Sequence, residues 1–454
     1  MKPLPRRRRR EGEQGVHRWR EHLRPSSKRT QLLLIGAVCG VILLGGGATI
    51  WAFSRPNQVT GNFVAVPVEL ARSSAPEQLS IGVVVSLSSA PGEGSQWKEA
   101  ANGAVVAAQR FAASGVTVQL LAADDHGTSD GATAAVNELA KRNVSGLVIA
   151  TSGSHVAAAT AAAHTHGLAS ILPYATNTTA LNEHSWLSGP TEHQIDSALA
   201  STLHDASRVL LVDAGGGTPD GIDPAVILHF AVGQDIGAFT TAVTAELTGD
   251  KPADRILVTG SAEMQAAAVA ALQAGSGTTP IVLTPEAQSP AFAPAVTAAK
   301  GTLSSQMSTV GVASGDASAL ENGENGRAMS AFLAGLRIAA DDAHVTALFG
   351  DRPFSEVASA ADSRSHDAVV ALVRGAGAAG SAEPAALATT LSTLMLNASN
   401  GLVGPPLDFS RPTALTGAVL TLHASRQNLG LRAATATPPL LWFAGNEKKQ
   451  GASQ

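Results

Sequence analysis

The chain has 454 residues, 44% of them hydrophobic and 15% charged, which excludes a wholly disordered polypeptide. At about 150 residues per domain, this length predicts about three domains or lobes. The single cysteine, Cys39, excludes an internal disulfide framework and a cysteine-based zinc site.

Basic residues are concentrated at the N-terminus. Residues 1–30 contain eleven Lys and Arg and three acids, which gives this segment a charge of +8. Because the net charge of the whole chain is −5, residues 31–454 carry a net charge of −13. The next segment, Gln31–Phe53, has 23 residues and no charge, and at about 1.5 Å per residue it would span roughly 35 Å as a helix. Because positive flanks stay in the cytoplasm, we expect a basic cytoplasmic segment at 1–30, a transmembrane helix at 31–53 and an extracytoplasmic remainder. The prediction is a single-pass protein of the cell membrane.

Three other interpretations of this region remain open. A cleaved secretory signal normally has a shorter apolar stretch and a shorter head than this one. Lipidation of Cys39 is disfavoured, because Gly36-Ala37-Val38 fits a lipobox poorly and the apolar run continues beyond it. The arginine run could bind nucleic acid, but beside an apolar span such a run more often sets topology or binds anionic lipid.

Residues 54–77 contain three prolines among small polar residues and are expected to form a linker. Short apolar runs then alternate with helical patterns. Strands are expected at 79–86, 116–122, 147–150 and 169–172, and helices at 97–113, 130–142 and 155–166. After a break at 188–191, strands are expected at 209–213, 255–260 and 280–284 and a helix at 263–274, while 225–230 and 237–239 are ambiguous. The last stretch predicts helices at 326–340 and 366–375 and strands at 406–409 and 418–422.

This alternation is typical of βαβ units in a parallel sheet. About 350 residues take part in it, which favours two α/β lobes over one very wide sheet.

Motifs of common enzyme classes are absent. The sequence has no phosphate-binding loop, no nucleophile elbow and no H-E-x-x-H zinc motif, and Gly215–Gly221 lacks the spacing of a dinucleotide-binding turn. His164 and His166 would point about 200° apart on a helix and could not share a metal ion. Asp124 and Asp125 could bind a cation, but such residues more often cap the following helix or fix its turn. The chain is therefore predicted to be no enzyme and to hold no metal and no cofactor.

A series of short motifs occurs in a consistent order across residues 78–430. It comprises Ser80–Ser88, Gln96-Trp97, Asn102–Ala104, Ala122–Asp125, Ser152–Ser154, Leu172–Asn177, Thr259–Met264, Thr284–Glu286, Asp367–Leu372 and Gly401–Phe409. Together these motifs resemble the type I periplasmic binding proteins, which include the leucine/isoleucine/valine-binding proteins.

The resemblance implies a two-lobed α/β fold in which each lobe is a parallel sheet flanked by helices, here preceded by one transmembrane helix. The expected ranges are 78–190 plus 312–412 for lobe 1, 191–311 plus 413–432 for lobe 2, and 433–454 for a C-terminal tail.

The resemblance also implies a ligand site between the lobes. The serine-rich turn would hold a carboxylate through Ser152 or Ser154, with Gly153 N–H, and the chain after the next strand would add Ala175 and Thr176. Glu286 would meet an ammonium group from the other lobe. Trp97 would line the cleft, Tyr174 would fill part of it, and Ser261 stands where relatives commonly place an aromatic residue. The alternatives are a helix cap for the serines, a turn hydroxyl for Thr176 and a surface carboxylate for Glu286.

Such proteins bind a small solute and pass it to an ABC permease. The implied function is a membrane-anchored extracytoplasmic solute-binding protein for an amino acid or a similar small polar solute, with the permease and the membrane (through 31–53) as partners and no nucleic acid. The alternative is a sensor or interaction ectodomain of the same fold, and a secreted hydrolase is a third, disfavoured hypothesis. With eight lysines and abundant alanine, the composition suggests a GC-rich, actinobacterial source.

Overall fold

The fold is described from a computed structural model, which covers residues 67–71, 74, 76, 78–275, 278–303, 306–427, 429–432 and 440–445. The predicted basic segment 1–30, the predicted transmembrane helix 31–53 and most of the predicted linker 54–77 lie outside these residues. Within the part of the chain that the structure covers, no helix has both the length and the apolar character needed to cross a bilayer.

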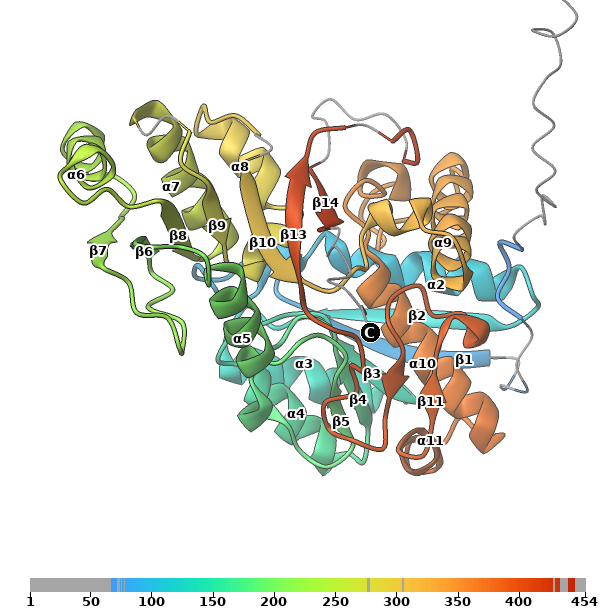
Figure 1. The fold of residues 1–454 in the computed structure, drawn as a ribbon. Coiled ribbons are helices and arrows are strands. Elements are labelled where there is room, and N and C mark those ends of the chain that lie inside the picture. The colour runs from blue at the N-terminus through green and yellow to red at the C-terminus, as the bar shows by residue number, and fades with distance from the viewer. Residues whose placement is uncertain are drawn as a thin grey trace, which may run out of the picture. The chain divides into compact units, whose positions relative to one another are not determined.

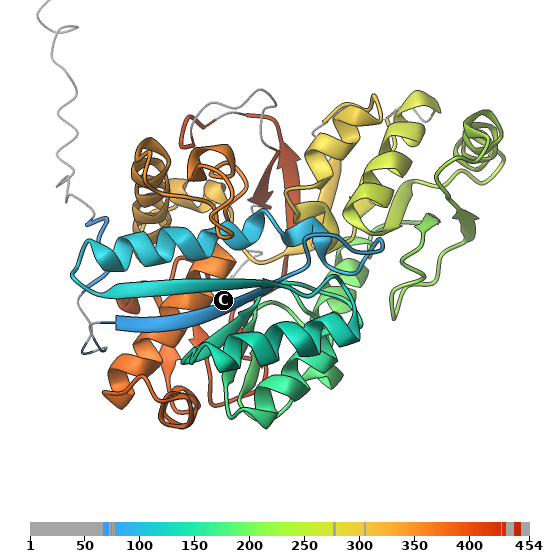
Figure 2. The same ribbon diagram turned by 180° about the vertical axis from the view of Figure 1, so that it is seen from behind.

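The first lobe is built around a five-stranded parallel sheet with strand order β2-β1-β3-β4-β5. Its strands are β1 (Gln78–Val85), β2 (Thr117–Asp124), β3 (Gly146–Ile149), β4 (Ala169–Leu172) and β5 (Ser185–Leu187). The helices α3 (Ser129–Lys141) and α4 (Val156–Thr165) cover one face, and α2 (Gly103–Ala112) and α10 (Ser363–Ala379) cover the other (Figure 2). This lobe also contains α9 (Glu324–Asp341), α11 (Pro384–Leu391) and the hairpin of β11 (Met395–Leu396) and β12 (Leu407–Asp408).

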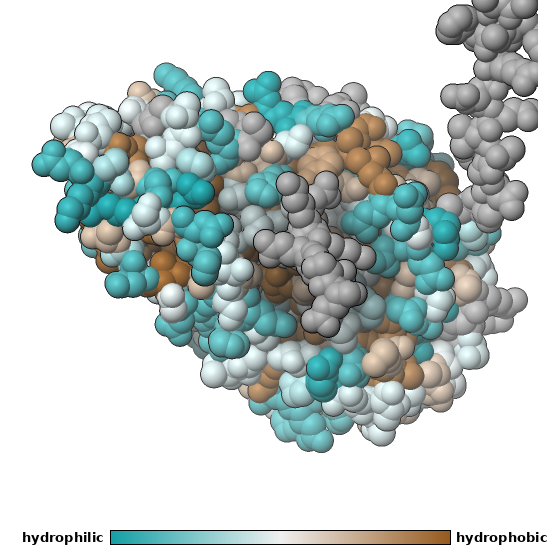
Figure 3. Space-filling view, in the orientation of Figure 1, coloured by the Kyte–Doolittle hydropathy of each residue, from teal (hydrophilic) through white to brown (hydrophobic). Residues whose placement is uncertain are grey.

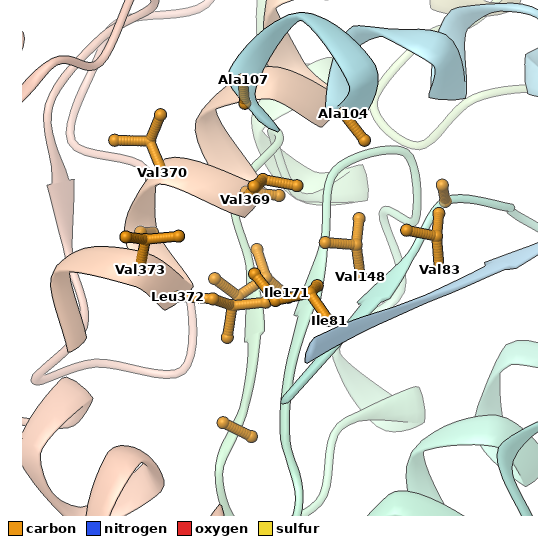
Figure 4. Close-up of a cluster of buried hydrophobic side chains, with 14 of the residues drawn as sticks. Ile81, Val83, Ala104, Ala107, Val148, Ile171, Val369, Val370, Leu372 and Val373 are labelled. Atoms are coloured by element: carbon orange, nitrogen blue, oxygen red, sulfur yellow. The ribbon is translucent and has the colours of Figure 1, made fainter. Parts of the chain in front are cut away.

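Helix α10 is the central element of the first core, although it comes nearly 300 residues after β1. It is buried on almost every side, as expected of its apolar second half, and the polar residues Ser363, Ser365, His366 and Asp367 of its first turns are buried as well. Figure 4 shows its valines and Leu372 in one cluster with side chains of α2 and of the sheet, including Ile81, Val148 and Ile171. The first lobe is therefore complete only when this later segment has packed on the early strands.

The second lobe is built around a seven-stranded sheet with strand order β14-β13-β10-β9-β8-β6-β7 (Figure 1). Its strands are β6 (Val209–Ala214), β7 (Val226–His229), β8 (Arg255–Gly260), β9 (Ile281–Leu283), β10 (Met307–Gly311), β13 (Leu420–Ser425) and β14 (Leu441–Ala444). One face packs against α6 (Ile236–Thr248), α7 (Ala262–Gly275) and α8 (Phe292–Ala298), and the other against α5 (Glu192–Thr202). In the space-filling view, hydrophilic residues cover much of the outer end of this lobe (Figure 3).

The two predicted α/β lobes are confirmed, and parallel strands form the whole first sheet and most of the second, but the second sheet ends in two antiparallel strands. Strand β13 is antiparallel to β10, and β14 is antiparallel to β13. The chain leaves the second lobe at the carboxyl end of β10 and later returns at the same edge, so Leu420 pairs with Gly311 and β13 runs the opposite way. Strand β14 also lies within 433–454, which the sequence analysis took for a tail.

Most predicted elements match the structure within a few residues, and the ambiguous segments 225–230 and 237–239 belong to β7 and α6. The prediction of one helix over 97–113 is corrected, since two short 3-10 helices precede α2. The sequence patterns did not predict α5, α8, α11, β5, β10, β11 and β14. The 3-10 helices are η1 (Ser95–Trp97), η2 (Ala100–Asn102), η3 (Thr178–Ala180), η4 (Pro285–Gln288), η5 (Asp316–Leu320), η6 (Phe354–Glu356) and η7 (Ala398–Asn400).

The described chain passes between the lobes at three places. These are the segments between β5 and α5, between β10 and η5, and between β12 and β13. Leu187 at the first passage forms a parallel bridge with Thr413 at the third, so these two connections run side by side.

Candidate functional site

A cavity of about 670 Å³ lies between the lobes. In the first lobe its walls come from the segments that follow β1, β3 and β4, and in the second lobe from those that follow β6, β8, β9 and β10. The carboxyl edges of the two sheets therefore face each other across it, which is where α/β sheets bind ligands.

Of the nine ligand-binding residues predicted from the sequence, the structure brings eight to this cavity. The exception is Ser154. The eight lining residues are Trp97, Ser152, Gly153, Tyr174, Ala175, Thr176, Ser261 and Glu286.

The turn after β3 distinguishes Ser152 from Ser154. The backbone N–H of Ser154 donates to Glu93 Oε2 at 2.8 Å, and its hydroxyl donates to Glu93 Oε1 at 3.1 Å. Ser154 thus holds the loop after β1, while Ser152 lines the cavity. Gly153 between them has a φ of 115°, and a Cβ atom there would lie 2.2 Å from Glu93 Oε2. This contact explains why a glycine interrupts the serine run.

A buried charged network supports this turn from behind. His155 has 1% of its side chain exposed, and it contacts Asp125 through Nε2 at 3.1 Å and Glu93 through Nδ1 at 3.0 Å. Burial lowers the pKa of His155, but the hydrogen bonds to the two carboxylates outweigh burial and raise its pKa above the ordinary value of 6.5. The Ser86 hydroxyl donates to Asp125 Oδ1 at 2.6 Å.

Asp124 and Asp125 shape the turn before α3 rather than capping the helix. Asp125 accepts the Gly127 N–H at 2.9 Å, and Asp124 accepts the N–H of His126 at 2.9 Å. The N-cap is Thr128, whose hydroxyl accepts the Gly131 N–H. Within the described residues, no group of three or more His, Cys, Asp and Glu side chains is arranged to hold a metal ion.

Trp97 and Tyr174 form the aromatic part of the cavity wall. Their rings stack with centroids 4.6 Å apart and an interplanar angle of 2°. The Tyr174 hydroxyl donates to Asp362 Oδ1 at 2.8 Å, and burial together with the charge of Asp362 raises the pKa of Tyr174 well above 10.0. Its polar end is therefore engaged at the start of α10.

Arg364 is a lining residue that sequence analysis missed. Its guanidinium carbon lies 4.5 Å from the Trp97 ring centroid and 4.6 Å from that of Tyr174, and its Nε donates to Asp362 Oδ2 at 3.0 Å. Arg364 is on the first turn of α10, far along the chain from the other lining residues of the first lobe. No local pattern marks it, because only the return of the chain to the first lobe brings it here.

The second lobe contributes the half-buried carboxylate of Glu286 and much backbone. Burial raises the pKa of Glu286, and a hydrogen bond from Thr284 offsets part of that rise. Asp213 accepts the N–H groups of Gly215 and Gly217 at 2.9 Å each, which fixes the glycine turn that lines this side.

Gln96 connects the two walls directly. Its Oε1 accepts the backbone N–H of Ala262 at 3.4 Å, across the cleft at the first residue of α7. Both residues are buried. The motif Gln96-Trp97 was noted in the sequence, but this contact between lobes has no local sequence signal.

Comparisons with known proteins bear on the fold. No protein family and no curated protein matches the chain. A branched-chain amino acid transporter substrate binding protein, LivJ from Streptococcus pneumoniae in complex with isoleucine, is 17% identical, with a TM-score of 0.57 over 81% of this chain and 100% of that one. A periplasmic binding protein type 1 from Bordetella pertussis is 13% identical, with a TM-score of 0.56 over 81% and 100% of the two chains.

A fatty acid ABC transporter substrate-binding protein from Thermomonospora curvata is 14% identical, with a TM-score of 0.57 over 83% of this chain and 94% of that one. These three solved structures are of binding proteins rather than enzymes. At such identities the likeness concerns the fold, which can carry different functions. The chain has the two-lobed fold of the type I periplasmic binding proteins, as its sequence motifs predicted.

Proposed function

We propose that this chain is a membrane-anchored extracytoplasmic solute-binding protein that clamps a small polar solute, an amino acid or a related compound, between its lobes for an ABC importer. The observation that supports the proposal best is the cavity between the two carboxyl edges, lined from both lobes by eight residues that the sequence singled out. The similar structures of known function are substrate-binding proteins of ABC transporters.

The first lobe would bind the carboxylate of the solute. The Ser152 hydroxyl, the Gly153 N–H and Thr176 follow neighbouring strands and line the cavity. Hydroxyl and backbone N–H donors hold a carboxylate without requiring a full counter-charge. Since Glu93 and His155 fix the turn, these donors are oriented before the solute arrives.

The second lobe would bind the ammonium group through Glu286. Burial makes the charged form of this carboxylate costly, and an ammonium nearby would lower its pKa again and stabilise the charged pair. A solute that contacts both walls favours the closed arrangement over any open one by its differential affinity. Closure also excludes water and strengthens both contacts.

A thermal-shift screen of the purified full-length chain over amino acids, amides and small carboxylates tests the solute class. A true solute at 100 times its dissociation constant should stabilise the fold by about 2.7 kcal/mol. Ser152→Ala, Thr176→Ala and Glu286→Ala should each weaken the binding of a hit by about tenfold or more. Glu263→Ala, an exposed acid on α7 outside the cavity, is the matched control and should leave the affinity unchanged.

If all three site variants bind the hit with unchanged affinity, this cavity is not the binding site of the solute. Protease treatment of intact cells tests the topology separately. Degradation of the two lobes from outside is expected, and full protection would contradict the extracytoplasmic location.

A further inference from the structure

A second cavity, of about 640 Å³, adjoins the first and shares Gln288, Val312 and Arg364 with it. Its first-lobe wall comes from residues 352–364, and its second-lobe wall from residues 287–294 and β14. Strands β13 and β14 stand between α8 and α9 at this place (Figures 1 and 2). The solute proposed above does not use this space.

Two of the three arginines that line the second cavity are neutralised by the protein itself. Arg352 donates to both Glu99 oxygens at 2.7 and 2.9 Å. Arg432 donates to both Asp316 oxygens at 2.6 and 2.8 Å and to the carbonyl oxygens of Ala358 and Ala361. Much of the remaining lining is apolar and comprises Pro290, Phe292, Pro294, Val357, Leu440 and Trp442. The cavity wall is therefore mixed, and an apolar body that enters it could bury hydrocarbon against this apolar part.

Arg364 is different, because only one of its nitrogens is used. Nε donates to Asp362, and no hydrogen bond from the two terminal nitrogens is found within the described chain. The side chain is 20% exposed, and two aromatic rings and one carboxylate hold it in place. A guanidinium fixed in this way presents a preformed fork for a carboxylate.

Unpartnered polar atoms also lie in the wall of this cavity. Ser289, of which 4% is exposed, has a hydroxyl oxygen without a hydrogen-bond partner among the described residues. Arg352 Nε lies 4.0 Å from Asp351 Oδ2 and likewise makes no hydrogen bond to the described residues. Buried polar groups in folded proteins nearly always have a partner. Both groups can donate, so a ligand that brings acceptor oxygens would satisfy them.

We propose that the second cavity is a separate binding site for an organic acid with an apolar body, whose carboxylate is held by Arg364 at the wall between the cavities. The body would lie against Phe292, Val357 and Trp442. An alkyl or aryl monocarboxylate fits this chemistry, whereas a neutral amide lacks the charge that the Arg364 fork selects. The proposal does not depend on which solute occupies the first cavity.

Calorimetric titration of the full-length chain with octanoate tests this site. Octanoate should bind, and octanamide should bind at least about tenfold more weakly, because it makes no charged hydrogen bond. Arg364→Gln should weaken octanoate by about tenfold or more and abolish the preference for the acid. Ala293→Trp places a large ring in the second cavity from α8 and should block octanoate, while Thr176→Ala in the first cavity should not change it.

Ala360→Leu fills the same cavity from the first lobe and replaces the tryptophan variant if that protein does not fold. Absence of octanoate binding to the wild type overturns the proposal. The proposal is also overturned if octanoate binds with equal affinity to the wild type, Arg364→Gln, Ala293→Trp and Ala360→Leu. The heat measured in the titration would then come from octanoate bound elsewhere on the protein. A loss in Thr176→Ala without a loss in the filled variants places the acid in the first cavity and refutes the second site. If no amino acid, amide or small carboxylate stabilises the protein in the thermal-shift screen but octanoate still binds, only the function proposed above is contradicted.

Discussion

In the first lobe the wall of the cleft rests on buried side chains, whereas in the second lobe much of it is exposed backbone. Behind the first wall, His155 and Asp125 are 1% and 0% exposed and form a charged network, and Trp97 stacks on Tyr174. In the second wall, residues 215–218 are exposed and are held mainly through the Asp213 carboxylate. The first wall is thus held by buried side chains, whereas this part of the second wall is a solvent-exposed turn with less packing behind it. Four substitutions test this contrast, from the largest expected effect to the smallest.

Asp125→Ala should have the largest effect. It removes one carboxylate of a buried network and leaves His155 and the Ser86 hydroxyl without that partner. Breaking a buried pair in this way costs about 3–5 kcal/mol of the free energy of unfolding, which urea denaturation measures. Asp205→Ala, whose side chain is 92% exposed, should stay within about 0.5 kcal/mol. Similar losses in both variants would mean that the first wall is no more rigid than the surface.

Gly153→Ala should come next, with a loss of about 1–3 kcal/mol. The residue has a positive φ, and the new methyl group would collide with Glu93. Gly167→Ala is the matched control, because Gly167 also has a positive φ, of 64°, but has open space around its missing Cβ. The difference between the two variants in thermal unfolding isolates the collision from the backbone strain. If Gly167→Ala is the worse of the two, the Glu93 contact does not constrain the turn.

His155→Gln should change how stability depends on pH. Because the pKa of His155 is raised in the folded state, its contribution is fully present below pH 6.5 and is lost as the pH rises through the folded pKa. The gap in unfolding free energy between wild type and variant should therefore narrow toward alkaline pH. Burial lowers the pKa of His366, so its contribution to the unfolding free energy has the opposite pH dependence and is lost as the pH falls below 6.5. Wild type and variant both contain His366, so this contribution cancels in the difference between them. A gap that widens above neutral pH would show that the network does not prefer charged His155.

Val232→Thr, in the turn after β7 of the second lobe, should have the smallest effect. The residue is 71% exposed, so this isosteric change should alter the unfolding free energy by less than about 0.5 kcal/mol. The same change at Val148, fully buried in β3, should cost about 1–3 kcal/mol, because it places a hydroxyl in an apolar core. Equal effects at the two positions would remove the distinction between a rigid first lobe and a tolerant second lobe.

What the sequence could predict follows from how local each signal is. The central strands are short runs of buried apolar residues, and the chain just after them forms the cleft, so Ser152, Thr176 and Glu286 could be placed without coordinates. Strand β5 has only three residues and begins with a buried serine, which weakens its pattern. Helix α5 is mostly polar, although the capping box of Thr191 and Gln194 was a usable signal.

Arg364, the Gln96–Ala262 contact and the second cavity could not be predicted, for a different reason. The Gln96–Ala262 contact and the packing of Arg364 on Trp97 join segments more than 150 residues apart, and the second cavity brings together residues 287–294, 352–364 and 440–442. Charge, periodicity and spacing describe neighbours along the sequence, whereas these features depend on how the passages between the lobes fold back. Even the antiparallel β13 follows from the edge at which the chain re-enters the second lobe, which no local pattern specifies.

The interleaved order of the lobes has a consequence for synthesis on the ribosome. When β10 has emerged, the sheet of β1–β5 still lacks α10, and its apolar side, with Ile81, Val148 and Ile171, has no cover from that helix. This apolar surface stays without α10 until residues 363–379 have been translated. The second sheet is completed later still, when β13 and β14 have been translated. A chain that stops before residue 363 lacks α10, β13 and β14, so neither of its lobes is complete.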